Sequence, residues 1–187
     1  MKKIILCAVL LVCLGIGGIF AADFTQFPEG IGPGPMINVG IGYGYTWGWN
    51  IKLPPIVASV DFPVSFIGGL PFTLGGGAGI AIYGYDGIYS GINYRYTELA
   101  ILGRFGYHPD LGVPNLDVYA IASLGIWLEF LKYAGGGYYS DYNSTWFHFG
   151  FGGSLGVRYY FTSFLGVWAE VGYTSLTVIS GGVSFKF

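Results

Sequence analysis

The chain has little charge, few histidines and few cysteines. Only 10% of its 187 residues are charged, against about a quarter in an ordinary soluble domain. A disordered chain needs few apolar residues and much charge, so a hydrophobic content of 53% excludes that class. Two histidines without thiols argue against a metal cluster, and both cysteines, Cys7 and Cys13, lie near the N-terminus.

The first 22 residues have the pattern of a secretory signal peptide. Lys2 and Lys3 precede an apolar stretch from Ile4 to Phe20, which meets small residues at Ala21 and Ala22. We expect cleavage after residue 21 or 22, and a permanent transmembrane helix is the less favoured alternative because the stretch is short. Cleavage removes both cysteines, which excludes disulfides and thiolate ligands. It also leaves 8 − 2 = 6 bases against 10 acids, so nucleic acid is not an expected partner.

Two long stretches without charge, Gly30–Ile51 and Phe62–Tyr85, are long enough to be membrane helices. Their glycines and prolines argue against helices, because each interior glycine costs about 1 kcal/mol and each proline about 3 kcal/mol. From Val39 to Trp49, large apolar or aromatic residues at odd positions alternate with four glycines and a threonine. This period of two is typical of a strand.

The same alternation recurs along the chain and predicts eight strands. They cover residues 39–49, 56–66, 72–83, 93–107, 116–131, 146–161, 165–173 and 177–187. The connections at 51–55, 84–92, 132–145 and 174–176 are expected at one end of the fold. Residues 23–35 contain three prolines and are expected to form an irregular lead-in.

One face of every predicted strand is broad and apolar, whereas the other mixes glycine with isolated polar residues. An eight-stranded barrel encloses only enough space for side chains to fill, and eight apolar stripes would overfill it. The apolar face is therefore expected outside, where only lipid stabilises it, and a closed barrel leaves no unpaired edge in lipid. The predicted fold is an all-β, eight-stranded, antiparallel, up-and-down transmembrane β-barrel over residues 36–187.

The chain resembles the small eight-stranded outer-membrane barrels of diderm bacteria, the OmpA-domain, OmpX and OmpW type. The resemblance rests on the signal peptide, the alternating segments and the terminal residues Val183, Phe185 and Phe187. It implies location in the outer membrane, contact with its lipid, a monomer, and recognition of those terminal residues by the barrel-assembly machinery.

Eight charged residues are expected to face the lumen and to form a salt-bridge network, since a buried charge needs a partner. They are Asp61, Glu98, Arg104, Asp117, Glu129, Arg158, Glu170 and Lys186. A lumen plugged in this way favours a structural or surface-exposed role. A narrow channel for small polar or amphipathic solutes, with some preference for cations, is the alternative.

The predicted loop Ala134–Asn143 is rich in glycine and tyrosine. Tyr138, Tyr139 and Tyr142 suit either recognition of an extracellular ligand or an interfacial aromatic girdle, and both interpretations stay open.

Gly152–Gly156 matches the G-x-S-x-G motif of hydrolases, which requires a turn between a strand and a helix. Here the motif lies within an alternating strand, and about 20 Å of extended chain separates Ser154 from His148. The other histidine, His108, falls in a predicted turn. A lipid-modifying enzyme is therefore a remote alternative. We expect no enzymatic activity, no cofactor and no metal.

Overall fold

The structure is a computed structural model of the chain. It describes residues 25–29, 31–32, 34–44, 50–64, 70–86, 93–134 and 142–187. The predicted signal peptide lies outside the described residues, as do Tyr138 and Tyr139. Within the described ranges, no helix is long and apolar enough to cross a membrane.

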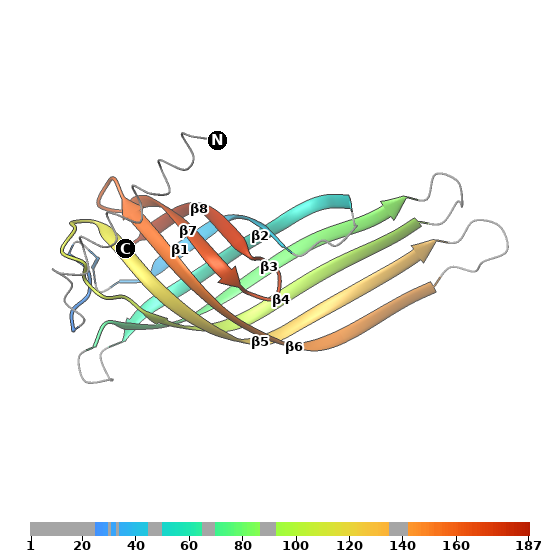
Figure 1. The fold of residues 1–187 in the computed structure, drawn as a ribbon, viewed down its shortest axis with the longest axis horizontal. Coiled ribbons are helices and arrows are strands. Elements are labelled where there is room, and N and C mark those ends of the chain that lie inside the picture. The colour runs from blue at the N-terminus through green and yellow to red at the C-terminus, as the bar shows by residue number, and fades with distance from the viewer. Residues whose placement is uncertain are drawn as a thin grey trace, which may run out of the picture.

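In the described part of the chain, eight antiparallel strands close into one barrel (Figure 1). Each strand pairs with its neighbours in sequence, and β1 pairs with β8. The strands are β1 (Met36–Tyr43), β2 (Asn50–Val64), β3 (Phe72–Asp86), β4 (Asn93–Tyr107), β5 (Leu116–Ala134), β6 (Tyr142–Tyr160), β7 (Leu165–Tyr173) and β8 (Ile179–Lys186). This confirms the predicted all-β, up-and-down barrel.

The bounds of β4 and β7 agree with the prediction, whereas β2, β3, β5 and β6 are longer than predicted. The loop predicted at residues 51–55 is wrong, because these residues belong to β2. The pairing of β2 with β3 shifts register between Ile51 and Leu53 and again between Leu53 and Ile56. The two prolines at positions 54 and 55 lie within this irregular stretch and have no N–H to donate, so the sequence there loses the period of two. β1 ends at Tyr43, and residues 45–49 of the predicted first strand lie outside the described residues.

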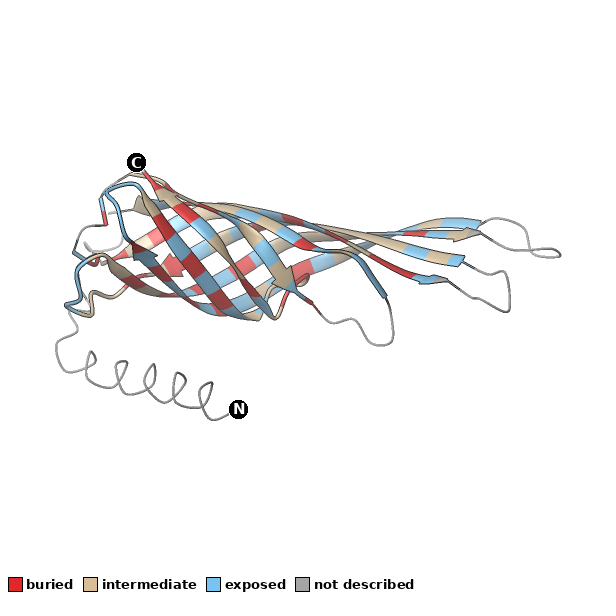
Figure 2. Cartoon of the chain, turned by 90° about the horizontal axis from the view of Figure 1, so that it is seen from above, coloured by how far each residue is buried: buried red, intermediate tan, exposed pale blue. Residues whose placement is uncertain are grey.

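The barrel has an apolar exterior and a polar interior. Phe149, Leu124 and Val167 point outward and are 65%, 58% and 48% exposed. Arg158 and Asp61 point inward and are fully buried. Buried and exposed residues alternate along the strands, and Figure 2 shows them as alternating red and pale-blue segments. The alternation reverses the arrangement of a soluble barrel, as the sequence predicts.

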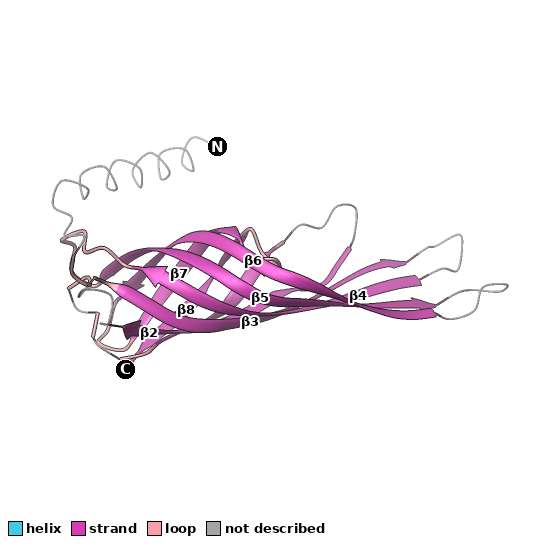
Figure 3. Cartoon of the chain, turned by 90° about the horizontal axis from the view of Figure 1, so that it is seen from below, coloured by secondary structure: helices cyan, strands magenta, loops and turns pink. Residues whose placement is uncertain are grey.

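The strands differ in length, and the barrel wall is therefore taller on one side. We call the end that carries Met36 and Lys186 the terminal end and the opposite end the far end. β5 and β6 pair as far as Tyr133 and Tyr142, whereas β6 pairs with β7 only from Gly153 onward. Strands β3 to β6 therefore extend beyond β7, β8 and β1 at the far end (Figures 1 and 3).

The described residues before β1 form turns and bends that cover the terminal end of the lumen. Pro28 is fully buried, and its carbonyl accepts a hydrogen bond of 3.0 Å from the N–H of Ile31. Ile31 packs against Met36 and Tyr160, which point inward from β1 and β6. The lead-in thus adds an apolar layer beneath the charged lumen.

Candidate functional site

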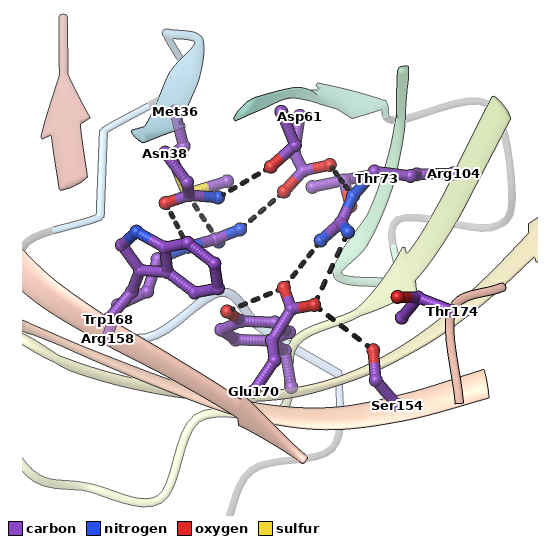
Figure 4. Close-up of polar contacts among 12 residues, drawn as sticks. Met36, Asn38, Asp61, Thr73, Arg104, Ser154, Arg158, Trp168, Glu170 and Thr174 are labelled. Carbon is purple, nitrogen blue, oxygen red and sulfur yellow. Dashed lines mark hydrogen bonds and ion pairs between the residues drawn. The ribbon is translucent and has the colours of Figure 1, made fainter. Parts of the chain in front are cut away.

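Asp61 of β2 lies in the lumen and binds two arginines from other strands (Figure 4). Its Oδ1 accepts a hydrogen bond of 3.0 Å from Arg104 Nε, and its Oδ2 pairs with Arg158 Nη2. Asp61 and Arg158 are fully buried, and the side chain of Arg104 is 8% exposed. Removing one partner of a buried ion pair leaves an uncompensated charge, which typically costs about 3–5 kcal/mol.

Arg104 of β4 carries the network on to Glu170 of β7. Its Nη2 lies 2.7 Å from Glu170 Oε1, and its Nη1 lies 3.4 Å from Oε2. The hydroxyl of Tyr119 donates to Oε1 at 3.0 Å, and that of Ser154 donates to Oε2 at 3.3 Å. Both oxygens of this buried carboxylate therefore have partners, as a charge in a narrow lumen requires.

Arg158 of β6 has partners on every side. Its Nη1 lies 2.9 Å from Asp117 Oδ2, and its Nε donates to Asn38 Oδ1 at 3.1 Å. The guanidinium carbon lies 4.1 Å from the centre of the Tyr119 ring, within the range of a cation–π contact. That ring needs a glycine on the neighbouring strand, because a Cβ at Gly156 would overlap the ring of Tyr119.

His108 lies directly after β4 and is fully buried. Its Nδ1 is 2.9 Å from Asp117 Oδ1, and its Nε2 is 2.9 Å from Thr73 Oγ1. A carboxylate can only accept, so Nδ1 donates, and in the neutral ring Nε2 accepts from the threonine hydroxyl. This order of hydroxyl, imidazole and carboxylate is that of a catalytic triad. Thr73 and Asp117 are also fully buried, however, so the three side chains act here as an internal brace.

The sequence predicts only a turn at His108 and does not predict that its ring joins the network in the lumen. The even-numbered residues of β4, such as Arg104, point into the lumen, and His108 is the next residue in this series. That parity could have indicated an inward ring. The rings of Phe27 and Tyr119 lie against it, with ring centres 6.0 Å and 5.2 Å away.

A cavity of about 50 Å³ lies in the lumen between the Arg104–Glu170 pair and the far end. Several hydroxyl-bearing residues line it: Ser59, Ser123, Thr174, Thr177 and Ser180. Leu176 also lines it; this residue of the turn between β7 and β8 is 4% exposed and packs with Ala100 and Leu102. From the terminal end to the far end, the lumen therefore has three levels: the charged network, a small cavity large enough for water, and an apolar cap formed by Leu176 with Ala100 and Leu102.

Two of the predicted network residues lie apart from it. Glu98 and Glu129 are directly opposite each other on β4 and β5, nearer the far end than Ala100. His148 Nε2 lies 3.6 Å from Glu129 Oε2. No arginine or lysine in the described ranges forms an ion pair with either glutamate. At this level β6 has no β7 beside it, because the two strands pair only from Gly153 onward, so both glutamates lie beyond the closed part of the lumen that holds the arginines.

Other residues selected from the sequence lie at the two ends of the barrel. Lys186 Nζ lies 4.3 Å from the centre of the Tyr160 ring at the terminal end. Val183 and Phe185 face outward on β8, and Phe187 follows that strand with 72% exposure. Tyr142 begins β6 at the far end and is exposed.

The G-x-S-x-G residues lie in the middle of β6, without a turn or a helix. Ser154 is buried, and its hydroxyl donates to Glu170. Among the described residues, no group of three or more histidine, cysteine, aspartate or glutamate side chains is arranged to hold a metal ion.

Comparison with known proteins supports the fold. No protein-family model matches the sequence, and no curated protein matches it significantly. A major outer membrane protein from Thermus thermophilus has a similar structure, with a TM-score of 0.57 and 12% identity, over 82% of this chain and 99% of that one. Ail of Yersinia pestis gives a TM-score of 0.48 at 11% identity, over 82% of this chain and 93% of Ail. The N-terminal barrel domain of Pseudomonas aeruginosa OprF gives 0.44 at 17% identity, over 83% and 99%. The closed eight-stranded barrel and the likeness to the Thermus protein give the chain the fold of the small eight-stranded outer-membrane barrels.

Proposed function

We propose that the protein is a non-enzymatic, integral outer-membrane barrel of a diderm bacterium, with a lumen closed by its own side chains. The exposed apolar belt supports a membrane location, because such a surface is stable only in lipid. We place the terminal end in the periplasm, where an even number of strands brings both ends of the barrel, and the far end outside the cell. Export depends on the predicted signal peptide.

The single observation that best supports a closed lumen is that the side chain of Arg158 crosses it. This side chain reaches from β6 to Asp61 on β2 and to Asn38 on β1, and is fully buried. The Leu176 cap lies beyond it toward the far end. A solute would have to disrupt both levels to pass.

The protein then acts through the surface that it presents, in a structural or surface-exposed role. Strands β3 to β6 carry this surface beyond the rest of the barrel at the far end. Tyr142 belongs to it, and with Tyr138 and Tyr139 it is our candidate for contact with an extracellular ligand. We expect a monomer whose residues Val183, Phe185 and Phe187 are recognised by the barrel-assembly machinery.

Conductance across planar lipid bilayers tests the closed lumen. The purified protein should insert, as shown by protection from protease, and give no steady channels. Steady conductance from the unmodified protein would overturn the proposal.

The cavity next to Arg104 and Glu170 favours one second candidate, a narrow channel for small polar or amphipathic solutes. In that case replacement of Arg104 would change an existing conductance rather than create one. Activity toward lipid is tested separately: we expect no release of acyl chains, either from the unmodified protein or from Ser154→Ala.

A further inference from the structure

Basic residues on the outer face of the strands occur only near the far end. In the described strands, the outward positions with a basic residue are Lys52, Arg95 and Lys132. On β5 the outward residues from Leu116 to Phe130 are all apolar, and Lys132 is the next one. On β4 the outward series passes a leucine and a threonine before it reaches Arg95. The bases therefore lie where the apolar belt ends.

Arg95 and Lys132 are directly opposite each other in the pairing of β4 and β5, and both are exposed. Like charges in this position repel each other and destabilise the sheet. No carboxylate among the described side chains pairs with either residue. Two cations that lie together with no described carboxylate beside them favour an anionic partner.

Lys52 of β2 extends the same line of bases across β3. A Cβ at Gly84 would lie 3.0 Å from Lys52 Cε and 3.3 Å from its Cγ, so the lysine stem runs over the glycine. Gly84 is the register partner of Arg95. We call Lys52, Arg95 and Lys132 the basic row; it crosses four neighbouring strands, a width of about 14 Å at the usual strand spacing.

Apolar surface continues directly from the basic row toward the terminal end. Phe130, Ile101 and Leu124 are 37%, 50% and 58% exposed on the outer faces of β4 and β5. A surface with cations above and hydrocarbon-like side chains below is complementary to an amphiphile with an anionic head and acyl chains. Arginine suits a phosphate head, because its planar guanidinium forms two parallel hydrogen bonds.

We infer that the basic row is a binding site for the phosphate headgroup of a lipid in the outer leaflet, whose acyl chains lie along Leu124 and Phe130. This inference rests on the proposed membrane location. It adds a specific lipid site to the general contact with lipid that any membrane barrel makes.

The test uses the protein refolded into phosphatidylcholine bilayers that contain a minor fraction of phosphatidylglycerol. Lipids that remain bound after gentle extraction are counted by native mass spectrometry. The unmodified protein should retain phosphatidylglycerol well above its share of the bilayer. The double variant Arg95→Gln/Lys132→Gln should lower this enrichment by about thirtyfold, since each base near an anionic lipid surface contributes a factor of about five.

The matched control is the double variant Arg95→Lys/Lys132→Arg, which keeps both charges and should keep the enrichment. An unchanged enrichment in the glutamine variant would overturn the lipid site while leaving the membrane location intact. Failure of the unmodified protein to enter bilayers would instead overturn the proposed function. Displacement of the lipid by inorganic phosphate alone at comparable concentration would show a small-anion site and would also contradict the inference.

Discussion

Arg158 of β6 and Asp61 of β2 form a fully buried ion pair between strands on opposite sides of the barrel. The two residues are 97 positions apart in the sequence. Their contact therefore joins distant parts of the chain through the lumen, in addition to the hydrogen bonds within the wall. Together with Asp117 and Asn38, it ties β1, β2, β5 and β6 to one guanidinium.

Replacement of this arginine should destabilise the barrel strongly. Arg158→Leu removes the cation and leaves Asp61 and Asp117 buried with fewer partners, so the free energy of unfolding should fall by about 3–5 kcal/mol. Urea unfolding in bilayers, followed by tryptophan fluorescence, measures this change. The control is Glu29→Gln, which removes an exposed charge outside the strands and should change stability by about 0.5 kcal/mol or less. Equal effects of the two variants would contradict the bracing role.

A side chain at Gly156 should destabilise the barrel as long as the ring of Tyr119 stays in its present position. Gly156→Val brings a Cβ into the tyrosine ring and should cost about 1–3 kcal/mol, because overpacking forces neighbouring groups to move. Tyr119→Leu frees space, so the double variant should lose less stability than the sum of the two single variants. A double-mutant cycle measures the coupling, and strict additivity would show that the two residues do not contact each other.

The free-energy cost of a charge on the outer face should depend on how deep in the bilayer it lies. Leu124→Arg places a cation in the middle of the apolar belt and should cost about 2–4 kcal/mol in bilayers. Phe130→Arg places it next to Lys132 at the far edge of the belt and should cost about 0–1 kcal/mol for the charge. Unfolding in bilayers compares the two variants. Similar costs would contradict the assignment of the belt's far edge.

Opening of the lumen should require changes at two levels. Leu176→Ala removes most of the apolar cap but leaves the Arg104–Glu170 pair, so we expect no steady conductance from this variant. The double variant Leu176→Ala/Arg158→Ala, which also removes the guanidinium that crosses the lumen, should give measurable channels in planar bilayers, provided that it still folds. Heat-dependent migration in electrophoresis checks folding. Conductance from Leu176→Ala alone would show that the charged level does not block the lumen.

The architecture could be predicted from the sequence because period-two alternation needs only local information. The bounds of β4 and β7 were predicted correctly, since their apolar and polar faces alternate without interruption. The far part of β2 was not predicted as a strand, because Pro54 and Pro55 interrupt the alternation and the pairing with β3 is irregular there. The extra length of β5 and β6 was also missed, since outward Lys132 and Asn143 are typical of loops.

The partners within the lumen could not be derived in the same way. Parity places Asp61, Arg104 and Arg158 on the inner face, but strand stagger and side-chain reach decide which of them meet. Glu98 has the same parity as Arg104 and still lies apart from the network, because its level on the wall, opposite Glu129 and Trp146, is beyond the end of β7. The brace between His108 and Asp117 depends on a residue after the end of β4, where parity is a weaker guide.

Cysteine scanning along β6 tests the central claim, an apolar exterior around a charged interior, most directly. Cys7 and Cys13 both precede Asp23, so the chain from Asp23 onward supplies a cysteine-free background. Single cysteines from Phe151 to Tyr160 would be labelled in bilayers and exposed to a lipid-soluble quencher. We predict strong quenching at the odd positions, which include Phe151, Leu155 and Val157, and weak quenching at the even ones. Quenching without alternation, or strongest at Ser154 and Arg158, would contradict the account.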